Sequence, residues 1–209
     1  MLRLMVFAID LEGVLAPEIW PALGESFGLP ELSLTTRDEA DFEALMRRRV
    51  AATRAARVPL AELQRVAGAL EPFPGAREFL ASLRQLGQVV IISDTFHELG
   101  EPMALRLGGH SLFANRFQVD GDGLVVGFRL RIRGRKERIV SGFRAAGFTV
   151  AAMGDSLNDM SILANCDHPL LYRPVAALKE RFPDAPSTDN LDDALRILSA
   201  AARSVEATE

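Results

Sequence analysis

The sequence predicts an α/β fold: a mainly parallel sheet flanked by helices, with a small helical insert after the first strand and a β-hairpin. Three observations support this prediction. Short apolar runs alternate with helical patterns, as in chains that form parallel sheets. The runs are continuously apolar, which is typical of strands covered on both faces. About eighty residues separate the first two runs, far more than a single crossover helix needs.

The expected parallel strands are short apolar runs, namely Leu4–Ile9, Val89–Ile92, Phe148–Met153 and the weaker Pro169–Tyr172. A hairpin is expected where Asp120–Gly123 separates Phe117–Val119 from Leu124–Arg133, because Asp-Gly pairs favour tight turns. Within the second arm, Phe128–Arg133 alternates apolar residues with arginines and predicts a strand with a solvated basic face. A nucleic-acid-binding face is the less favoured alternative, since the row lacks aromatic stacking partners.

Helical patterns fill the long interval between the first two strands. Thr36–Glu39 has the form of a capping box and predicts a helix through about Arg57. Leu60–Leu70 and Ala76–Leu86 predict two more helices, with prolines and a glycine between them. We therefore expect residues 17–73 to form the insert, and residues 1–16 and 74–209 to form the core. The cluster Arg47–Arg49 has acidic neighbours and is expected to lie mostly on a solvated helix face.

Composition excludes several classes of protein. The 209 residues are 48% hydrophobic and carry a formal net charge of −4, so neither a nucleic acid nor a membrane surface is an expected partner. The single cysteine, Cys166, excludes an intrachain disulfide and a cysteine-rich zinc site. No apolar stretch approaches the ~20 residues of a membrane span, and the first run lacks a cleavage site. We expect a cytoplasmic enzyme, monomeric or homodimeric.

Carboxylates follow two of the predicted strands. Asp10 and Glu12 come directly after the first, and residues two apart in an extended segment point the same way. Two carboxylates in one cleft can serve as nucleophile and as proton donor; the alternative is a strand end followed by a turn. Asp155, Asn158 and Asp159 follow the Phe148–Met153 run. Their oxygens suit Mg²⁺; the alternative is helix capping, which fits Asp159 better than the group as a whole.

Polar and basic side chains occur at two further points. Ser93 and Asp94 follow the second strand, where a hydroxyl near a helix start can bind a phosphate oxygen; the alternative is a helix N-cap. Lys136 stands at the expected start of a helix, where a cation is unfavourable for the helix dipole. Taken alone it is a surface charge, and nothing in the sequence prefers it to Arg135.

The order of these motifs is more specific than any one of them. Strand–DxE, helical insert, strand–Ser, basic helix start and strand–GDxxND together resemble the haloacid dehalogenase superfamily of phosphatases. The insert after the first motif resembles the phosphoserine phosphatase branch. The segments DLEGVLAPEIW, TTRD, SDTF and GDSLND are similar to the bifunctional phosphoserine phosphatase/homoserine phosphotransferase type. This resemblance implies a Rossmann-like core, a helical cap, a role in serine biosynthesis and a Mg²⁺ cofactor.

The resemblance also implies roles for individual residues. Asp10 matches the nucleophile and Glu12 the general acid/base. Mg²⁺ would bind Asp10, the backbone carbonyl of Glu12 and Asp155, with Asp159 as a supporting acid. The implied phosphate contacts are Ser93, Asp94, Lys136 and Asn158. The implied substrate contacts in the cap are Glu18 for an ammonium, Arg49 for a carboxylate, and Phe42. Without the resemblance, Glu18 is a surface acid and Arg49 part of a solvated face.

One position departs from the superfamily pattern, in which Asp usually stands where this sequence has Glu12. Glutamate is one methylene longer, so its proton donor is displaced or folded back. Our hypothesis is that this slows hydrolysis and favours phosphate transfer to another acceptor, such as homoserine. The expected function is a Mg²⁺-dependent phosphatase or phosphotransferase acting on phosphoserine. The alternatives are a phosphatase for another small phosphorylated metabolite and a non-catalytic α/β binding module.

Overall fold

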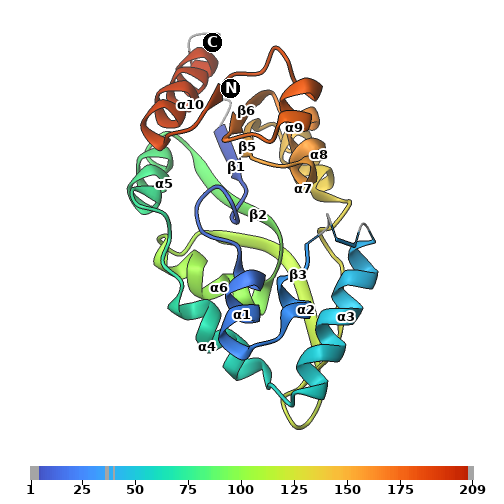
Figure 1. The fold of residues 1–209 in the computed structure, drawn as a ribbon. Coiled ribbons are helices and arrows are strands. Elements are labelled where there is room, and N and C mark those ends of the chain that lie inside the picture. The colour runs from blue at the N-terminus through green and yellow to red at the C-terminus, as the bar shows by residue number, and fades with distance from the viewer. Residues whose placement is uncertain (1–4, 36–37, 40, 207–209) are drawn as a thin grey trace.

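A seven-stranded sheet forms the centre of the molecule (Figure 1). The computed structural model describes residues 5–35, 38–39 and 41–206. The strands are β1 Met5–Ile9, β2 Gln88–Phe96, β3 Ser111–Val119, β4 Val125–Arg129, β5 Thr149–Gly154, β6 His168–Tyr172 and β7 Ser187–Thr188. Their order across the sheet is β4-β3-β2-β1-β5-β6-β7, and every neighbouring pair is parallel except β3 with β4. The predicted mainly parallel α/β fold is therefore confirmed.

Strand β1 lies between β2 and β5, and all five of its residues are buried. Its last residue, Ile9, is in register with Ile91 of β2 and Met153 of β5. Because the three strands are parallel, their carboxyl ends meet at one edge of the sheet. The motifs that follow Ile9 and Gly154 are thereby brought together, although they are far apart in the sequence.

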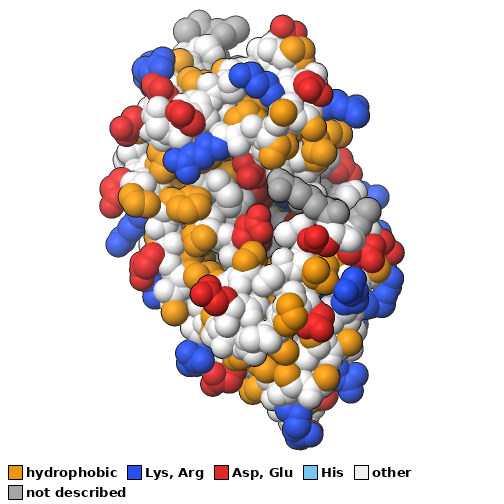
Figure 2. All heavy atoms as spheres, in the orientation of Figure 1, with side chains coloured by type: hydrophobic (Ala, Val, Ile, Leu, Met, Phe, Trp, Pro, Cys, Tyr) orange, Lys and Arg blue, Asp and Glu red, His pale blue; other side chains and the backbone are white. Residues whose placement is uncertain are grey.

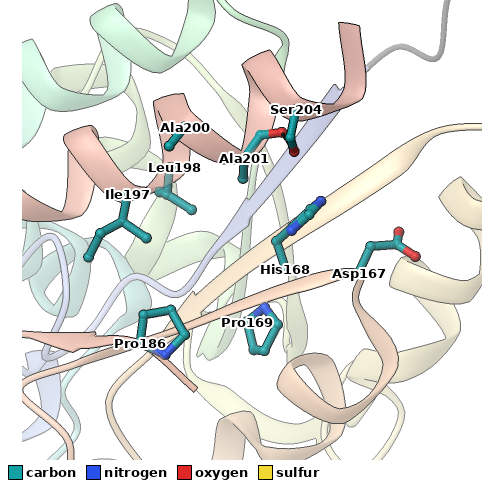
Figure 3. Close-up of a pocket in the computed structure, with 9 residues that line it drawn as sticks. All are labelled: Asp167, His168, Pro169, Pro186, Ile197, Leu198, Ala200, Ala201 and Ser204. Carbon is teal, nitrogen blue, oxygen red and sulfur yellow. Dashed lines mark hydrogen bonds between the residues drawn. The ribbon is translucent and has the colours of Figure 1, made fainter. Parts of the chain in front are cut away.

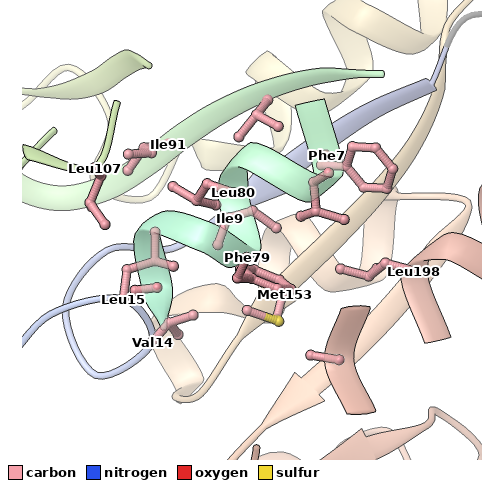
Figure 4. Close-up of a cluster of buried hydrophobic side chains, with 14 of the residues drawn as sticks. Phe7, Ile9, Val14, Leu15, Phe79, Leu80, Ile91, Leu107, Met153 and Leu198 are labelled. Atoms are coloured by element: carbon pink, nitrogen blue, oxygen red, sulfur yellow. The ribbon is translucent and has the colours of Figure 1, made fainter. Parts of the chain in front are cut away.

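Helices cover both faces of the sheet. They are α1 Ile19–Phe27, α2 Pro30–Ser33, α3 Phe42–Ala55, α4 Leu60–Ala69, α5 Ala76–Arg84, α6 His97–Arg106, α7 Lys136–Ala145, α8 Met160–Asn165, α9 Ala176–Arg181 and α10 Leu191–Glu206, with a 3-10 turn η1 Leu157–Asp159. On one face Phe7 and Ile9 pack with Leu80 of α5 and Leu198 of α10 (Figure 4). On the other, Val6 packs with residues of α7, α8 and α9. Alternate residues of β1 thus serve opposite faces.

Of the five described helices between β1 and β2 in the chain, the first four, α1 to α4, occupy the lower part of Figure 1. They share a third apolar cluster with the far ends of β2 and β3. Trp20 of α1 meets Phe96 and Phe117 edge-on, and these two phenylalanine rings stack with centroids 3.9 Å apart. Because aromatic burial is a large part of such a core, the helices between β1 and β2 are anchored to the sheet as well as to one another.

Two local predictions require correction. The strand expected over Phe128–Arg133 ends at Arg129, because the side-chain oxygen of the buried Asn115 takes the backbone N–H groups of Arg131 and Ile132 that a longer ladder would have used. The helix expected from Thr36 to about Arg57 begins later, at Phe42, and two helices that were not expected individually, α1 and α2, precede it. The cap of α3 is Asp41, whose carboxylate accepts from the backbone N–H groups of residues 43 and 44.

Thr36 and Arg37 of the expected capping box lie outside the described residues. The predicted hairpin is present, with the carboxylate of Asp120 accepting from the backbone N–H groups of Asp122 and Leu124 in the turn. Among the described residues, no helix is both long and apolar enough to cross a bilayer.

Candidate active site

A cavity of about 460 Å³ lies beyond the carboxyl ends of β1, β2 and β5, where helices α1 and α3 face them. Acidic side chains lie beside a hollow near the middle of the face shown in Figure 2. The cavity is lined by Asp10, Glu12, Glu18, Trp20, Thr35, Phe42, Leu45, Arg49, Ser93, Asp94, Thr95, Lys136, Asp155, Ser156, Leu157, Asn158 and Val175. Every site residue expected from the sequence is in this set except Asp159, which is fully buried behind the wall.

The loop after β1 interlocks with the loop after β5. Asp10 extends the ladder by donating its backbone N–H to the carbonyl of Met153 at 3.0 Å. Gly13 has a φ of +83°, and a Cβ built on it would lie 2.3 Å from Oδ2 of Asp155. Only glycine leaves room for the carboxylate there. The close approach places Asp155 directly against the loop that carries Asp10.

Lys136 is the cation at the centre of the site. Its side chain is 2% exposed, and its Nζ lies 2.8 Å from Asp159 and 3.3 Å from both Asp10 and Asp94. Burial lowers the pKa of this ammonium, but the three carboxylates outweigh burial and raise it well above its usual value. The surface-charge alternative is therefore wrong for Lys136, whereas Arg135 is exposed.

Three aspartates converge beside this lysine. Carboxylate oxygens of Asp10, Asp155 and Asp159 lie within 4.8 Å of one another. Burial and the neighbouring Asp159 raise the pKa of Asp10 well above its usual value, and the same two causes raise the pKa of Asp155 to about 7. Close carboxylates repel one another, and a hard divalent cation that binds their oxygens offsets this repulsion. The donor set therefore fits Mg²⁺.

Asp159 is already held on both of its carboxylate oxygens. Oδ1 accepts from Lys136, and Oδ2 accepts from the backbone N–H groups of Asp155 and Ser156 at 3.2 and 3.3 Å. A Cβ on Gly154 would lie 2.4 Å from the Cβ of Asp159, so the glycine is required for this packing. The helix-capping alternative thus describes what Oδ2 of Asp159 does. Its other oxygen, Oδ1, holds the ammonium of Lys136 in place.

Glu12 points toward the helices that follow β1. Its Oε1 accepts from the backbone N–H of Ile19, the first residue of α1, at 2.7 Å. Burial raises the pKa of this carboxyl, and the Ile19 hydrogen bond opposes the rise only in part. A carboxyl with a raised pKa in a cavity is suited to donating a proton. The longer side chain is folded onto the N-terminus of α1.

The opposite end of the cavity carries Arg49 of α3. Arg49 is buried, its guanidinium lies over the ring of Trp20 at 4.4 Å, and it donates to the carbonyl of Leu34. Burial lowers its pKa to about 10, while Glu12 and Glu18 act in the opposite direction. The solvated-face expectation is therefore wrong for Arg49, although its two arginine neighbours in the sequence are exposed.

The remaining predicted residues lie around this same cavity. Glu18 is exposed immediately before α1, and Phe42 is the first residue of α3. Ser93 is buried and accepts from the backbone N–H of Thr95. The helix-cap alternative for Ser93 and Asp94 is wrong, because α6 begins only after Phe96 and has no side-chain cap.

Comparison with known proteins agrees with this arrangement. Residues 4–167 match the haloacid dehalogenase-like hydrolases. The chain belongs to this family of hydrolases. It is 36% identical over 201 residues to the phosphoserine phosphatase ThrH of Pseudomonas aeruginosa, covering 96% of this chain and 98% of that protein. It is 37% identical over 188 residues to a phosphoserine phosphatase of Pseudomonas syringae pv. tomato, covering 90% and 79% of the two chains.

Solved structures of phosphoserine phosphatases share the fold of this hydrolase. A phospho-aspartyl intermediate analogue superimposes with a TM-score of 0.77 at 20% identity, covering 94% of this chain and 99% of that one. A substrate-bound complex superimposes with a TM-score of 0.76 at 20% identity, covering 93% and 97%. The predicted resemblance to the phosphoserine phosphatase branch is confirmed.

A second cavity of the hydrolase, of about 370 Å³, lies between β6 and α10 (Figure 3). Its lining is mostly apolar and includes Pro169, Pro186 and Leu198. Of its two titratable residues, Asp167 is already bonded to Arg144 and to a backbone N–H, and His168 begins strand β6. This cavity does not bring together a nucleophile, a proton donor and a cation, so the chemistry belongs to the first one.

Some residues of the site were not anticipated from the sequence. Thr95, Ser156 and Val175 line the cavity, and Arg133 reaches its wall, donating to Asp94 of β2 and Asn158 of η1. Thr95 and Ser156 directly follow the predicted residues Asp94 and Asp155, so these neighbours were the available signal. No local signal separates Arg133 from Arg131, because the two alternate in the same arginine row.

Proposed function

We propose that this hydrolase is a Mg²⁺-dependent phosphoserine phosphatase that works through an aspartyl-phosphate on Asp10. The observation that carries the proposal is the convergence of Asp10, Lys136 and Asp155 at one end of a cavity whose other end holds the buried Arg49. One end suits a phosphate ester and the other a carboxylate. The names of the relatives support the choice of phosphoserine.

In the first step, a carboxylate oxygen of Asp10 attacks phosphorus while the bond to the serine oxygen breaks. Lys136 offsets the charge of the phosphate and of the nucleophile. Glu12, protonated beforehand, gives its proton to the leaving serine oxygen. In the second step, water attacks phosphorus and returns a proton to Glu12, which frees phosphate and the Asp10 carboxylate.

The metal site we propose consists of Asp10, the backbone carbonyl of Glu12 and Asp155, with Asp159 in support. Mg²⁺ bound there would supply charge neutralisation for the phosphate oxygens. The proposed phosphate contacts are Ser93, Asp94, Lys136 and Asn158. All four line the same cavity.

We propose that residues 17–73 form a cap over a core made of residues 1–16 and 74–209. Within the cap, Arg49 would bind the substrate carboxylate, Glu18 its ammonium group, and Phe42 its carbon atoms. Support comes from the guanidinium of Arg49, which is buried at the cavity and has a buried Nε without a partner among the described residues. An arginine fork recognises a carboxylate with defined geometry.

Charge reversal at the cap tests the substrate. Arg49→Glu should lower kcat/KM for phosphoserine by about 100-fold or more, because a repulsive carboxylate replaces a charged hydrogen bond. Hydrolysis of p-nitrophenyl phosphate, which lacks the amino acid group, should change far less. The matched control is Arg48→Glu, an exposed neighbour on the same helix. An equal loss on both substrates would favour a general phosphatase for another small metabolite. If the wild-type protein were inactive on a broad phosphomonoester panel, a binding module would be favoured instead.

Transfer to homoserine is a second outcome of the same chemistry. The observation that favours it is the hydrogen bond that holds Oε1 of Glu12 at the backbone N–H of Ile19, which would leave this carboxyl less free to activate water. Glu12→Asp should shift the products toward free phosphate, because the shorter side chain releases this anchor. The measurement is the ratio of phosphohomoserine to phosphate when homoserine is present. An unchanged ratio contradicts the hypothesis.

The raised pKa values predict how stability depends on pH and metal. Asp155 has a pKa of about 7 in the folded protein and ~3.9 when unfolded. The folded state therefore binds the proton more tightly, and stability falls as pH rises from about 4 to 7. Mg²⁺ binds the unprotonated carboxylates, so its addition should raise the unfolding midpoint more at pH 8 than at pH 5. Calorimetry with EDTA or Mg²⁺ checks this, and Asp155→Asn should remove the difference.

A further inference from the structure

Arg133 connects three parts of the molecule that meet at the cavity. Its Nη1 donates to Asp94 of β2 at 3.2 Å and to Asn158 of the turn after β5 at 2.6 Å. The same guanidinium lies 4.5 Å from the ring centroid of Phe42, the first residue of α3. Its side chain is 23% exposed, in contrast to the exposed Arg131. One side chain thus contacts strand β2, the turn after β5 and helix α3, which carries Arg49.

The backbone that carries Arg133 is held by a single buried amide. Asn115 of β3 accepts from the backbone N–H groups of Arg131 and Ile132 at 2.9 and 3.0 Å, and its Nδ2 donates to the carbonyl of Asp94 at 2.7 Å. The same residue therefore links the segment that presents the guanidinium to the part of β2 that receives it. Because Asn115 is buried and bonded to both segments, the backbone position of Arg133 is set by the fold.

The charge of Arg133 matters where it lies. Asp94 shares its carboxylate between Arg133 and Lys136, with Oδ2 at 3.2 Å and 3.3 Å from the two cations. Without the guanidinium, Asp94 would have only the lysine to neutralise it. Lys136 would then be drawn from Asp10 toward Asp94, and an uncompensated negative charge would face an incoming phosphate.

We infer that Arg133 is a positioning residue that couples helix α3 to the phosphate end of the site. Its hydrogen bonds set Asp94 and Asn158, and its face holds Phe42 by a cation–π contact. The inference deepens the proposed function and rests on it. Movement of α3 away from the core would break the Phe42 contact. The contact therefore holds helix α3 and the phosphate end of the site in one arrangement.

A double-mutant cycle tests the coupling. Arg133→Met should lower kcat/KM for phosphoserine by about 10- to 100-fold, the rate equivalent of losing charged hydrogen bonds. Arg133→Lys should recover part of this loss, because it keeps the charge without the planar fork. Phe42→Leu combined with Arg133→Met should depart from the product of the two single losses by at least about twofold. Strictly multiplicative losses would overturn the inference.

Hydrogen exchange supplies a readout that does not need turnover. Arg133→Met should speed amide exchange in residues 42–48, the start of α3, while Arg131→Met, at the exposed neighbour, should not. Unchanged exchange in the Arg133 variant would overturn the inference even if activity falls. If the wild type does not hydrolyse phosphoserine, the proposed function fails, but the exchange comparison still decides whether Arg133 holds α3.

Discussion

Asp10→Asn should abolish phosphate release from phosphoserine, with kcat lowered by at least about 10⁴-fold, because an amide removes the covalent route altogether. The same change should not unfold the protein. Burial and Asp159 raise the pKa of Asp10 well above its usual value, so the folded state disfavours the charge that Asn deletes. We therefore expect a higher unfolding midpoint at pH 8 in EDTA, measured by calorimetry alongside phosphate release.

The two readouts together separate a lost nucleophile from a damaged fold. Trapping with substrate and acid quench should give phosphate on the wild-type protein and none on the variant. Persistent turnover in Asp10→Asn after purification from a phosphatase-free background would contradict the mechanism. A lower unfolding midpoint would contradict the electrostatic account of the site while leaving the nucleophile in place.

Lys136→Met should damage both stability and activity. The ammonium neutralises three carboxylates, and its side chain is 2% exposed. Removing one partner of a buried ion pair leaves uncompensated charge and costs about 3–5 kcal/mol. Methionine preserves most of the length, so the loss measures charge more than volume. Urea unfolding should give this decrease in free energy, and phosphate release should fall by more than about 100-fold.

The sequence offers a matched control for this prediction. Lys179, the only other lysine, is exposed on α9, and Lys179→Met should change neither quantity. The destabilisation at position 136 should shrink at acid pH, because protonation of the neighbouring aspartates removes the charge left unpaired. A Lys136→Met protein as stable as the wild type at pH 8 would show that the lysine does not neutralise the cluster.

The strands and the positions of the acidic motifs could be predicted because their signals are local. A continuously apolar run such as Val89–Ile92 indicates a buried strand whichever strands lie beside it. This run lies within β2. Asp10 and Asp155 follow such runs directly, and parallel strands bring their carboxyl ends to one edge. A helix was expected to start close to Ser93, but α6 begins only after Phe96, because β2 continues through Asp94 to that residue.

The arginines show where local reasoning stopped. Arg131 and Arg133 occupy equivalent positions in the alternating row, yet only Arg133 turns inward. Asn115 ends the strand before both residues, and Asp94 and Asn158 accept hydrogen bonds from the guanidinium of Arg133. Arg49 stands among exposed arginines but is buried against Trp20. Such outcomes depend on partners far along the chain, which no window of neighbouring residues contains.

By itself, the sequence determined the α/β class, the order of the motifs and the carboxylates available for chemistry, since periodicity and strand ends are properties of short segments. Only the tertiary structure decided that Lys136, not Arg135, is the buried cation, and that Asp159 holds it from behind. The physical reason is that the preference of a charge for burial is set by the opposite charges that surround it. Those charges lie after β1, within β2 and after β5, and they meet only when the sheet is formed.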